Sequence, residues 1–183
     1  MKDRSLLVVV DMQNDFICGS LGTKEAEAIV LKVADKIRSW DGDIIFTKDT
    51  HGENYLESRE GRRLPVLHCI AGTEGHELHP DIDGARRAYT EACGVDCVII
   101  EKPSFGSLEL AGLIGSGSYD RIEFAGLCTD ICVISNVLIA KAASPESDII
   151  VDASCCAGVT PQSHKNALDA MRACQIDVIG DAL

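Results

Sequence analysis

The run Leu6-Leu7-Val8-Val9-Val10-Asp11, close to the start of the chain, places five apolar residues directly before a carboxylate. Five more short runs rich in Val and Ile follow at residues 44–46, 97–100, 122–125, 149–151 and 176–179. A continuous apolar run of this length is typical of a strand that is buried on both faces. The sequence therefore predicts six buried strands, of which residues 6–10 form the first.

Helix-like stretches separate most of these runs. Residues 24–40 repeat apolar side chains at the spacing of one helix face, and residues 161–174 begin with a proline after Thr160, a common way for a helix to start. Two more helices are expected at residues 108–114 and 131–143. Strands that alternate with helices predict a three-layer α/β/α fold with a six-stranded, mainly parallel sheet.

The length and composition favour one domain, residues 1–183, in a reducing compartment. A chain of 183 residues can bury a hydrophobic core without disulfides or a structural zinc ion. Its nine cysteines, an odd number, favour free thiols. No run approaches the ~20 apolar residues of a membrane span or forms a signal-peptide core, so we expect a cytoplasmic protein. The net charge of -12 argues against nucleic acid and anionic membranes as partners.

Chemically reactive side chains follow several of the predicted strands. Asp11 ends the first strand, Lys102 follows the third, and Cys132 lies shortly after the fourth. Because ligands bind outside the carboxyl ends of the strands in an open parallel sheet, these three side chains could meet in one pocket. The alternative, that Asp11 and Lys102 form an ion pair while Cys132 fills the core, stays open on spacing alone.

Cys132 is the candidate nucleophile of this group. With Thr129 as the N-cap of the helix, the thiol falls in the first turn, where backbone N–H groups and a nearby Lys102 would stabilise a thiolate. Asp11 could then move protons between the thiol, a leaving group and water.

A second candidate cluster lies in the region of residues 50–83, which is rich in Gly and Pro and reads as a long loop. Asp49, His51 and His68, with Glu60 between them, form a reasonable ligand set for Zn, Fe or Mn. On spacing alone the indication is weak, because loop histidines are common. The other three histidines are expected to be surface or capping residues: His76, His79 and His164.

Three segments resemble the motifs of the isochorismatase-like cysteine hydrolases, in the order that this family has them. They are Leu7-Val8-Val9-Val10-Asp11-Met12-Gln13-Asn14-Asp15-Phe16, then Lys102-Pro103-Ser104-Phe105-Gly106-Ser107, then Gly126-Leu127-Cys128-Thr129-Asp130-Ile131-Cys132-Val133. The resemblance implies the family's fold, a catalytic triad, a cis peptide between Leu127 and Cys128, and an oxyanion hole from two backbone N–H groups. In this numbering the triad is Asp11, Lys102 and Cys132, and the two N–H groups belong to Cys128 and Cys132.

The nicotinamidase branch is the part of the family that the chain resembles most. Its metal ligands match Asp49, His51 and His68, with Glu60 as a fourth, and residues 68–75 resemble its His-Cys-x-x-Gly-Thr-x-Gly segment. The resemblance implies a divalent metal, with Zn expected and Fe or Mn possible, that orients the pyridine ring of nicotinamide for hydrolysis to nicotinate and ammonia. It also implies a small-molecule amide as partner and a homo-oligomer.

One departure concerns the substrate pocket. The branch commonly has an aromatic residue just before the metal histidine, where this chain has Leu64-Pro65-Val66-Leu67-His68. An aromatic wall must then come from Phe16 or Phe105, beside Leu127, or be absent. Two alternatives remain: another amide or carbamoyl hydrolase with the same triad, and a non-catalytic binding or redox-sensing protein.

Overall fold

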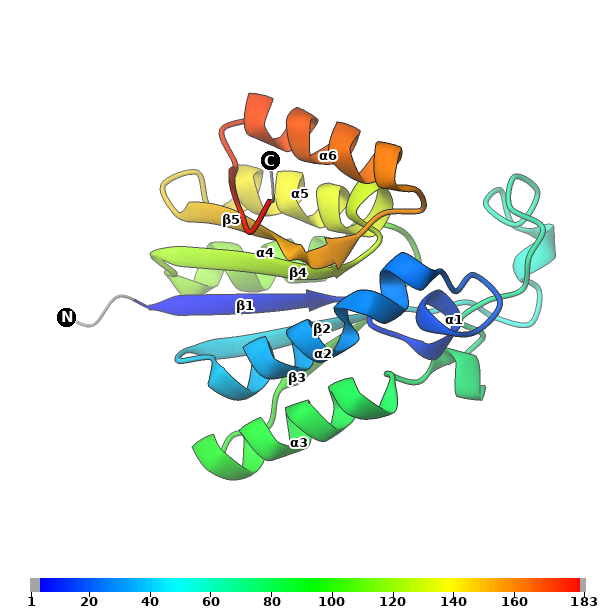
Figure 1. The fold of residues 1–183 in the computed structure, drawn as a ribbon, viewed down its shortest axis with the longest axis horizontal. Coiled ribbons are helices and arrows are strands. Elements are labelled where there is room, and N and C mark those ends of the chain that lie inside the picture. The colour runs from blue at the N-terminus through cyan, green and yellow to red at the C-terminus, as the bar shows by residue number, and fades with distance from the viewer. Residues whose placement is uncertain (1–3, 182–183) are drawn as a thin grey trace.

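The protein folds around one six-stranded parallel sheet, here in a computed structural model that describes residues 4–181 (Figure 1). The strand order is β3-β2-β1-β4-β5-β6, and every neighbouring pair is parallel. The strands are β1 (Ser5–Val10), β2 (Asp43–Asp49), β3 (Val98–Lys102), β4 (Arg121–Leu127), β5 (Asp148–Ala157) and β6 (Asp177–Ile179). All six predicted strands are present, and the predicted α/β sheet is confirmed.

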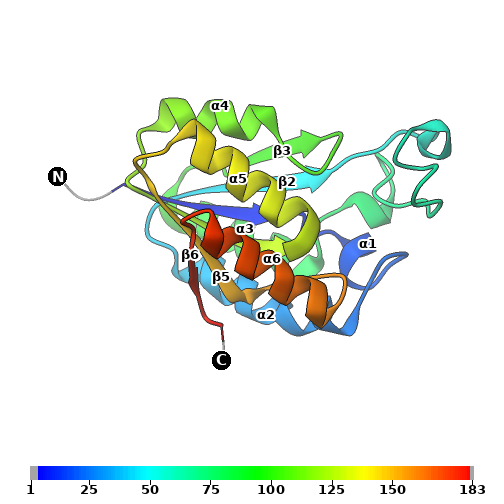
Figure 2. The same cartoon turned by 90° about the horizontal axis from the view of Figure 1, so that it is seen from above.

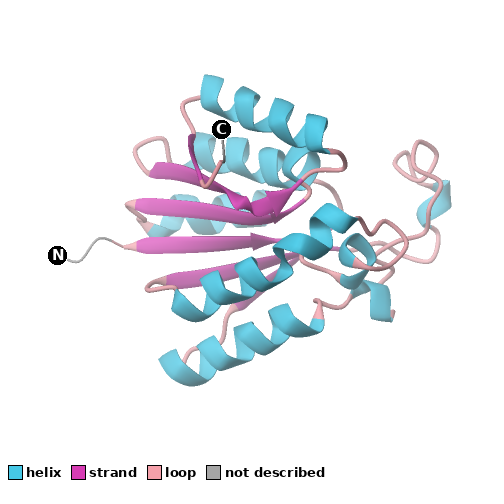
Figure 3. Ribbon diagram, in the orientation of Figure 1, coloured by secondary structure: helices cyan, strands magenta, loops and turns pink. Residues whose placement is uncertain are grey.

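Helices cover both faces of the sheet, as Figures 2 and 3 show. After the short α1 (Asn14–Ile17), α2 (Lys24–Ser39) and α3 (Pro80–Cys93) pack on one face. The other face carries α4 (Leu108–Gly117), α5 (Ile134–Ala143) and α6 (Pro161–Ala173). This double cover explains the apolar run of β1, where Leu6 and Val8 enter one core and Leu7 and Val9 the other.

Helix α3 was not predicted, because the sequence shows only a narrow apolar stripe there. Ile82 and Ala85 are its fully buried apolar residues, and Gly84 interrupts the pattern. Its end signals are nevertheless regular. At the start, His79 precedes the first helical residue, Pro80, and its side chain accepts a hydrogen bond from the Asp81 N–H. At the end, Gly94 adopts the left-handed conformation. The predicted loop at residues 50–83 is therefore shorter than expected.

A buried ion cluster fastens α2 to the sheet. The Lys36 ammonium lies 2.7 Å from the Asp152 carboxylate of β5 and also pairs with Glu123 of β4. Arg121 bonds the second oxygen of Glu123. These carboxylates interrupt the apolar pattern of their strands and are stable there because each has a cation.

The carboxyl ends of β1, β2, β3 and β4 converge on one edge of the sheet, where the long 50–79 segment projects (Figure 1). Gly126 lets β4 approach β1 closely, since a Cβ at this position would overlap the Val10 backbone, and its φ of 124° suits glycine. No helix among residues 4–181 is long and apolar enough to cross a lipid bilayer.

Candidate active site

Asp11, Lys102 and Cys132 meet at the carboxyl edge of the sheet. The Lys102 ammonium lies 2.7 Å from Asp11 Oδ2 and 3.5 Å from Cys132 Sγ. At most 4% of the surface of each residue is exposed. The structure thus brings together the three residues proposed from strand-end positions, although their catalytic roles remain predictions.

The turn out of β1 fixes the Asp11 carboxylate. Asp11 has a φ of 48°, a left-handed conformation that is uncommon for a non-glycine residue and is often found at functional sites. Its Oδ1 accepts a 2.6 Å hydrogen bond from the Thr47 hydroxyl. Its Oδ2 faces Lys102 and has no partner of good hydrogen-bond geometry among residues 4–181, so it can accept a proton.

Burial and mutual attraction set the charges of the acid and the lysine. Burial alone would lower the pKa of Lys102, but the neighbouring Asp11, Cys132 and Asp49 outweigh it and hold that pKa above its usual range. Burial raises the pKa of Asp11 even though Lys102 opposes the rise. Asp11 is therefore a stronger base than an exposed aspartate, and Lys102 stays charged.

The groups around Cys132 act on its thiol in opposite directions. Burial raises the pKa of the Cys132 thiol well above its ordinary value, Asp11 raises it further, and Lys102 lowers it. Lys102 also pairs with Asp11, so its positive charge is divided between the Asp11 carboxylate and the Cys132 sulfur. The thiol therefore lies beside a carboxylate that can take its proton.

The helix start at Cys132 also differs from the prediction. Residues Thr129–Val133 form one π-helical turn before α5, and Cys128, not Thr129, is the N-cap. The Thr129 hydroxyl instead lies 2.7 Å from Nδ1 of His164 on α6, so this histidine is half-buried against the turn and is not a surface residue. The peptide between Leu127 and Cys128 is cis, as the resemblance implied.

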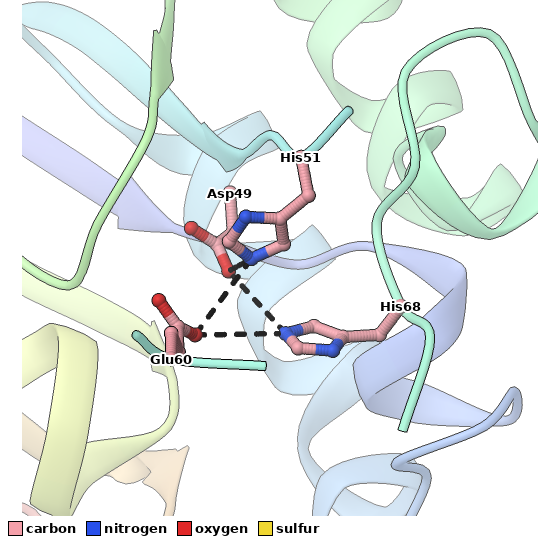
Figure 4. A group of neighbouring side chains, drawn as sticks. All are labelled: Asp49, His51, Glu60 and His68. Atoms are coloured by element: carbon pink, nitrogen blue, oxygen red, sulfur yellow. Dashed lines mark hydrogen bonds and ion pairs between the residues drawn. The ribbon is translucent and has the colours of Figure 1, made fainter. Parts of the chain in front are cut away.

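The four predicted metal ligands form one compact group (Figure 4). One ligand atom from each of Asp49, His51, Glu60 and His68 lies within 4.8 Å of the others. Nε2 of His51 is 3.0 Å from Asp49 Oδ2, and Nε2 of His68 is 3.7 Å from the same oxygen. Glu60 Oε1 faces both rings, at 3.7 and 4.0 Å.

The chemistry of this group fits a divalent cation. Two imidazoles and two carboxylates suit Zn, Fe or Mn, and Nδ1 of His68 is held 2.8 Å from the Val66 carbonyl, which leaves Nε2 for a metal. The two histidines and Lys102 overcome burial and hold the pKa of Asp49 below its usual range. The residues can hold such an ion without rearranging the fold.

Asp49 joins the metal-binding group to the Asp11-Lys102-Cys132 group. One carboxylate oxygen faces His51, and the other lies 3.3 Å from the Lys102 ammonium. The buried Gln13 amide holds this residue in place: Gln13 Oε1 accepts from the Asp49 N–H at 2.7 Å, and Nε2 donates to the Asp49 and His76 carbonyls at 2.9 Å. Gln13 was not predicted as a site residue.

The aromatic surroundings of the metal-binding group include a residue that the sequence analysis missed. The Phe16 ring centroid lies 5.6 Å from that of His68, which puts the ring beside the histidine, where we expected an aromatic wall of the substrate pocket. The missed Tyr55 lies 4.5 Å from the His51 ring and 4.9 Å from the His68 ring. It comes from a short 3-10 turn in the loop, where a lone aromatic among polar residues was the available signal.

The remaining predicted positions are placed as follows. Leu127 is buried at the end of β4, whereas Phe105 is 41% exposed in the loop after Lys102. His79 caps α3, as expected. His76 is buried, against expectation, and its Nε2 lies 2.8 Å from the Thr50 hydroxyl.

A groove of about 700 Å³ lies at the opposite, amino-terminal edge of the sheet. It is lined by residues that include Arg4, Trp40, Asp43 and Tyr89. Arg4 and Asp43 pair with each other at 2.9 Å, and the groove brings together no acid, lysine and thiol comparable to those at the other edge. We therefore place the site at the carboxyl edge.

Fold and site together define an α/β protein with a buried Asp-Lys-Cys group beside a metal-binding group. The chain belongs to the isochorismatase family, whose isochorismatase domain matches residues 5–182. It is 26% identical to the nicotinamidase/pyrazinamidase of Mycobacterium tuberculosis, over 94% of this chain and 97% of that protein.

Two solved structures show the same fold over nearly all of both chains. The nicotinamidase/pyrazinamidase of Bacillus subtilis has a TM-score of 0.84 at 23% identity and covers 96% of this chain and 98% of its own. The pyrazinamidase of Pyrococcus horikoshii, in complex with zinc, has a TM-score of 0.76 at 26% identity and covers 97% and 99%.

Proposed function

We propose that the protein is a metal-containing cysteine amidohydrolase that converts nicotinamide to nicotinate and ammonia. The observation that carries this proposal is the shared position of Asp49, which faces His51 of the metal-binding group and Lys102 of the Asp-Lys-Cys group. The metal-binding group and the Asp-Lys-Cys group are therefore in direct contact through Asp49 and Lys102. The full-length similarity to a nicotinamidase/pyrazinamidase supports the same activity.

In the first half of the reaction, the Cys132 sulfur attacks the amide carbonyl while Asp11 accepts the thiol proton. The backbone N–H groups of Cys128 and Cys132 stabilise the oxyanion. Asp11 then passes its proton to the departing nitrogen, so that ammonia leaves and a thioester remains on Cys132. The Lys102 charge stabilises the developing thiolate and keeps the returning Asp11 carboxylate paired.

In the second half, Asp11 takes a proton from water, and the hydroxide attacks the thioester carbonyl. The carbon–sulfur bond breaks, Asp11 returns its proton to the Cys132 sulfur, and nicotinic acid leaves and ionises to nicotinate. The burial of all three side chains excludes bulk water and strengthens the charge interactions among them.

Asp49, His51, Glu60 and His68 would hold the metal, which we propose to be zinc because two imidazoles and carboxylates suit it. A bound divalent ion would supply a Lewis-acid contact for the pyridine nitrogen and so orient the ring. Phe16 and Tyr55 lie against the histidines of this group, where they would pack on a planar aromatic substrate.

The cellular setting follows from the same proposal. A small amide, and not a nucleic acid or a membrane, is the proposed partner, and a cytoplasmic, single-domain homo-oligomer that recycles the pyridine ring for NAD is the proposed context. A size-exclusion measurement with light scattering tests the homo-oligomer directly.

Ammonia release from nicotinamide, pyrazinamide and a panel of aliphatic amides tests the function. We expect turnover of the two aromatic amides with little turnover of the aliphatic ones. Turnover confined to another amide or carbamoyl compound would assign the same chemistry to a different substrate. No turnover and no acyl adduct on Cys132 would leave the non-catalytic alternative.

A further inference from the structure

Asn136 is a buried amide near the start of α5, whose other buried residues, Val137 and Ala140, are apolar. It lies on α5, four residues after Cys132, and is completely inaccessible to solvent. Its Nδ2 donates to the Cys132 carbonyl at 2.8 Å and to the Phe105 carbonyl at 3.0 Å. Its Oδ1 accepts from the Ser107 N–H at 2.9 Å. Both N–H groups of the amide are therefore used.

These bonds connect two segments that both carry site residues. Phe105 and Ser107 belong to the loop that follows Lys102, and Cys132 belongs to the π-helical turn. The amide bonds the loop backbone at alternate positions, as a neighbouring strand would. At the far end of this loop, the Ser107 hydroxyl caps α4 by accepting from Leu110 N–H at 3.1 Å.

We propose that Asn136 is a positioning residue that holds the Lys102 loop, including Phe105, at a fixed place relative to the Cys132 thiol. This inference deepens the proposed function, because it names the residue that keeps the cation and the nucleophile in register. Asn136 does not touch the reacting atoms and acts through the backbones that it joins.

Two physical arguments support the assignment. The Lys102 ammonium acts on Cys132 Sγ across 3.5 Å in a buried site, where a charge interaction is stronger than in water and weakens as the distance grows. A polar side chain inside an apolar helix is costly unless it is fully bonded, and an apolar residue of similar size would fill the same space. Asn136 therefore does more than fill the core, since it supplies a donor and an acceptor that the loop backbone needs.

Two substitutions test the inference. Asn136→Leu keeps most of the volume and removes all three hydrogen bonds. Asn136→Ser keeps a hydroxyl that can bond the carbonyl four residues earlier, that of Cys132, but it is too short to reach the loop. The matched controls are Asn166→Leu and Asn166→Ser on the exposed face of α6, where Asn166 Oδ1 accepts a hydrogen bond from Gln162.

Three measurements on the purified full-length variants separate positioning from simple support of the fold. Circular dichroism defines the temperatures at which each variant is folded, and elemental analysis gives the metal content. The alkylation rate of Cys132 by iodoacetamide, followed by peptide mass spectrometry from pH 6 to 10, reports how strongly Lys102 acts on the thiol. Turnover of nicotinamide then gives kcat and KM.

For folded Asn136→Ser we expect wild-type metal content, an alkylation profile shifted to higher pH, and a kcat at least about tenfold lower. Both Asn166 variants should match the wild type. If Asn136→Leu does not fold, Asn136→Ser decides. A wild-type alkylation profile in the folded variants overturns the inference, whatever happens to turnover. If the wild type fails to hydrolyse nicotinamide, the proposed function fails, but the alkylation profiles still decide the role of Asn136.

Discussion

The ammonium of Lys102 lies 3.5 Å from the sulfur of Cys132, and both side chains are buried. Burial and Asp11 both raise the pKa of this thiol, and Lys102 is the cation that lowers it. The reactivity of Cys132 therefore depends on the positive charge of Lys102. The effect of Lys102 can be separated from that of Asp11, because the two act on the thiol in opposite directions.

Lys102→Met should reduce the reactivity of Cys132, because the variant keeps much of the side-chain length and loses its charge. We expect slower alkylation by iodoacetamide near neutral pH and a rate-versus-pH profile shifted upward. Turnover should fall further than alkylation, since the lysine also stabilises Asp11. Asp11→Asn is the control of opposite sign: alkylation should persist or quicken while turnover is lost. Wild-type alkylation and turnover in Lys102→Met would remove this lysine from the mechanism.

The two cysteines of the nucleophile segment should respond differently to replacement. Cys132→Ala should abolish turnover, by at least about 10³-fold, because no other side chain can form the thioester. Cys128→Ala should keep much of the activity, since position 128 is proposed to act through its backbone N–H. Mass spectrometry of enzyme quenched during turnover checks the site of the adduct. An adduct on Cys128, with an active Cys132→Ala variant, would reverse the assignment.

The ion cluster at Lys36 should matter far more for stability than a surface pair of similar geometry. Lys36→Met leaves the buried Asp152 without its cation, which typically costs about 3 to 5 kcal/mol of unfolding free energy. Because Arg121 still pairs with Glu123 in this variant, we expect a loss near the lower end of that range. Lys165→Met removes a 2.6 Å pair with Asp169 whose side chains are 66% and 51% exposed.

That surface variant should lose much less unfolding free energy than Lys36→Met. Urea unfolding at pH 7 measures both losses, and equal losses would contradict the importance of burial.

The pH dependence of the stability that the Lys36–Asp152 pair contributes has a definite sign. Burial alone would raise the pKa of Asp152, but Lys36 outweighs it and holds the pKa below its usual value. The stability from this pair is therefore present above about pH 4 and is lost as the pH falls through the lowered pKa.

Most of the sheet could be predicted from the sequence, because residues buried on two faces leave continuous apolar runs such as Leu6 to Val10. Helix α3 could not, since only a narrow stripe of it is buried. The strand-end rule predicted that Asp11, Lys102 and Cys132 could meet at one edge, and the resemblance then favoured a triad. The metal-binding group needed the resemblance, because its histidines lie in a loop without periodicity.

The residues that were missed act through distant backbone groups. Gln13 bonds Asp49, 36 positions away, and Asn136 bonds Phe105, 31 positions away. No spacing rule predicts such partners. The available signal for Asn136 was a polar amide next to apolar residues, whereas Gln13 lies among polar residues and gave no such signal. Thr129 was misassigned for a related reason: N-cap preference favoured it, but the π-helical turn moved the cap to Cys128 and left its hydroxyl to His164.

His164 should make the protein sensitive to mild acid. Burial lowers the pKa of this histidine below its ordinary value, and Asp181 and Asp130 only partly oppose the effect. The folded state therefore binds fewer protons than the unfolded state, whose histidine has a pKa of about 6.5. The contribution to stability is complete above that pH and is lost as the pH falls toward the lowered pKa.

His164→Gln keeps a side chain that can bond Thr129 but does not titrate. The fall in melting temperature between pH 7.5 and 5.5 should be smaller in this variant than in the wild type. Other acid-sensitive groups are common to both proteins and cancel in the comparison. An equal or larger fall in the variant would show that His164 does not carry this sensitivity.

The metal-binding group should hold close to one equivalent of Zn, Fe or Mn per chain in protein grown with these metals. His68→Ala should remove most of that metal, because it takes away one of only two imidazoles in the group. His79→Ala, which changes a histidine that caps α3, is the matched control and should keep the ion. Ligand imidazoles must be neutral, so occupancy should fall as the pH drops through the histidine range near 6.5. Elemental analysis after dialysis at pH 7.5 and 5.5 measures both effects.

Glu60→Gln tests whether the fourth group is a direct ligand. If it is, this variant should lose metal, but less than His68→Ala loses. Metal-free wild-type protein whose turnover ignores chelators would contradict the metal role of the whole group, while leaving the thiol chemistry of Cys132 to stand on its own tests.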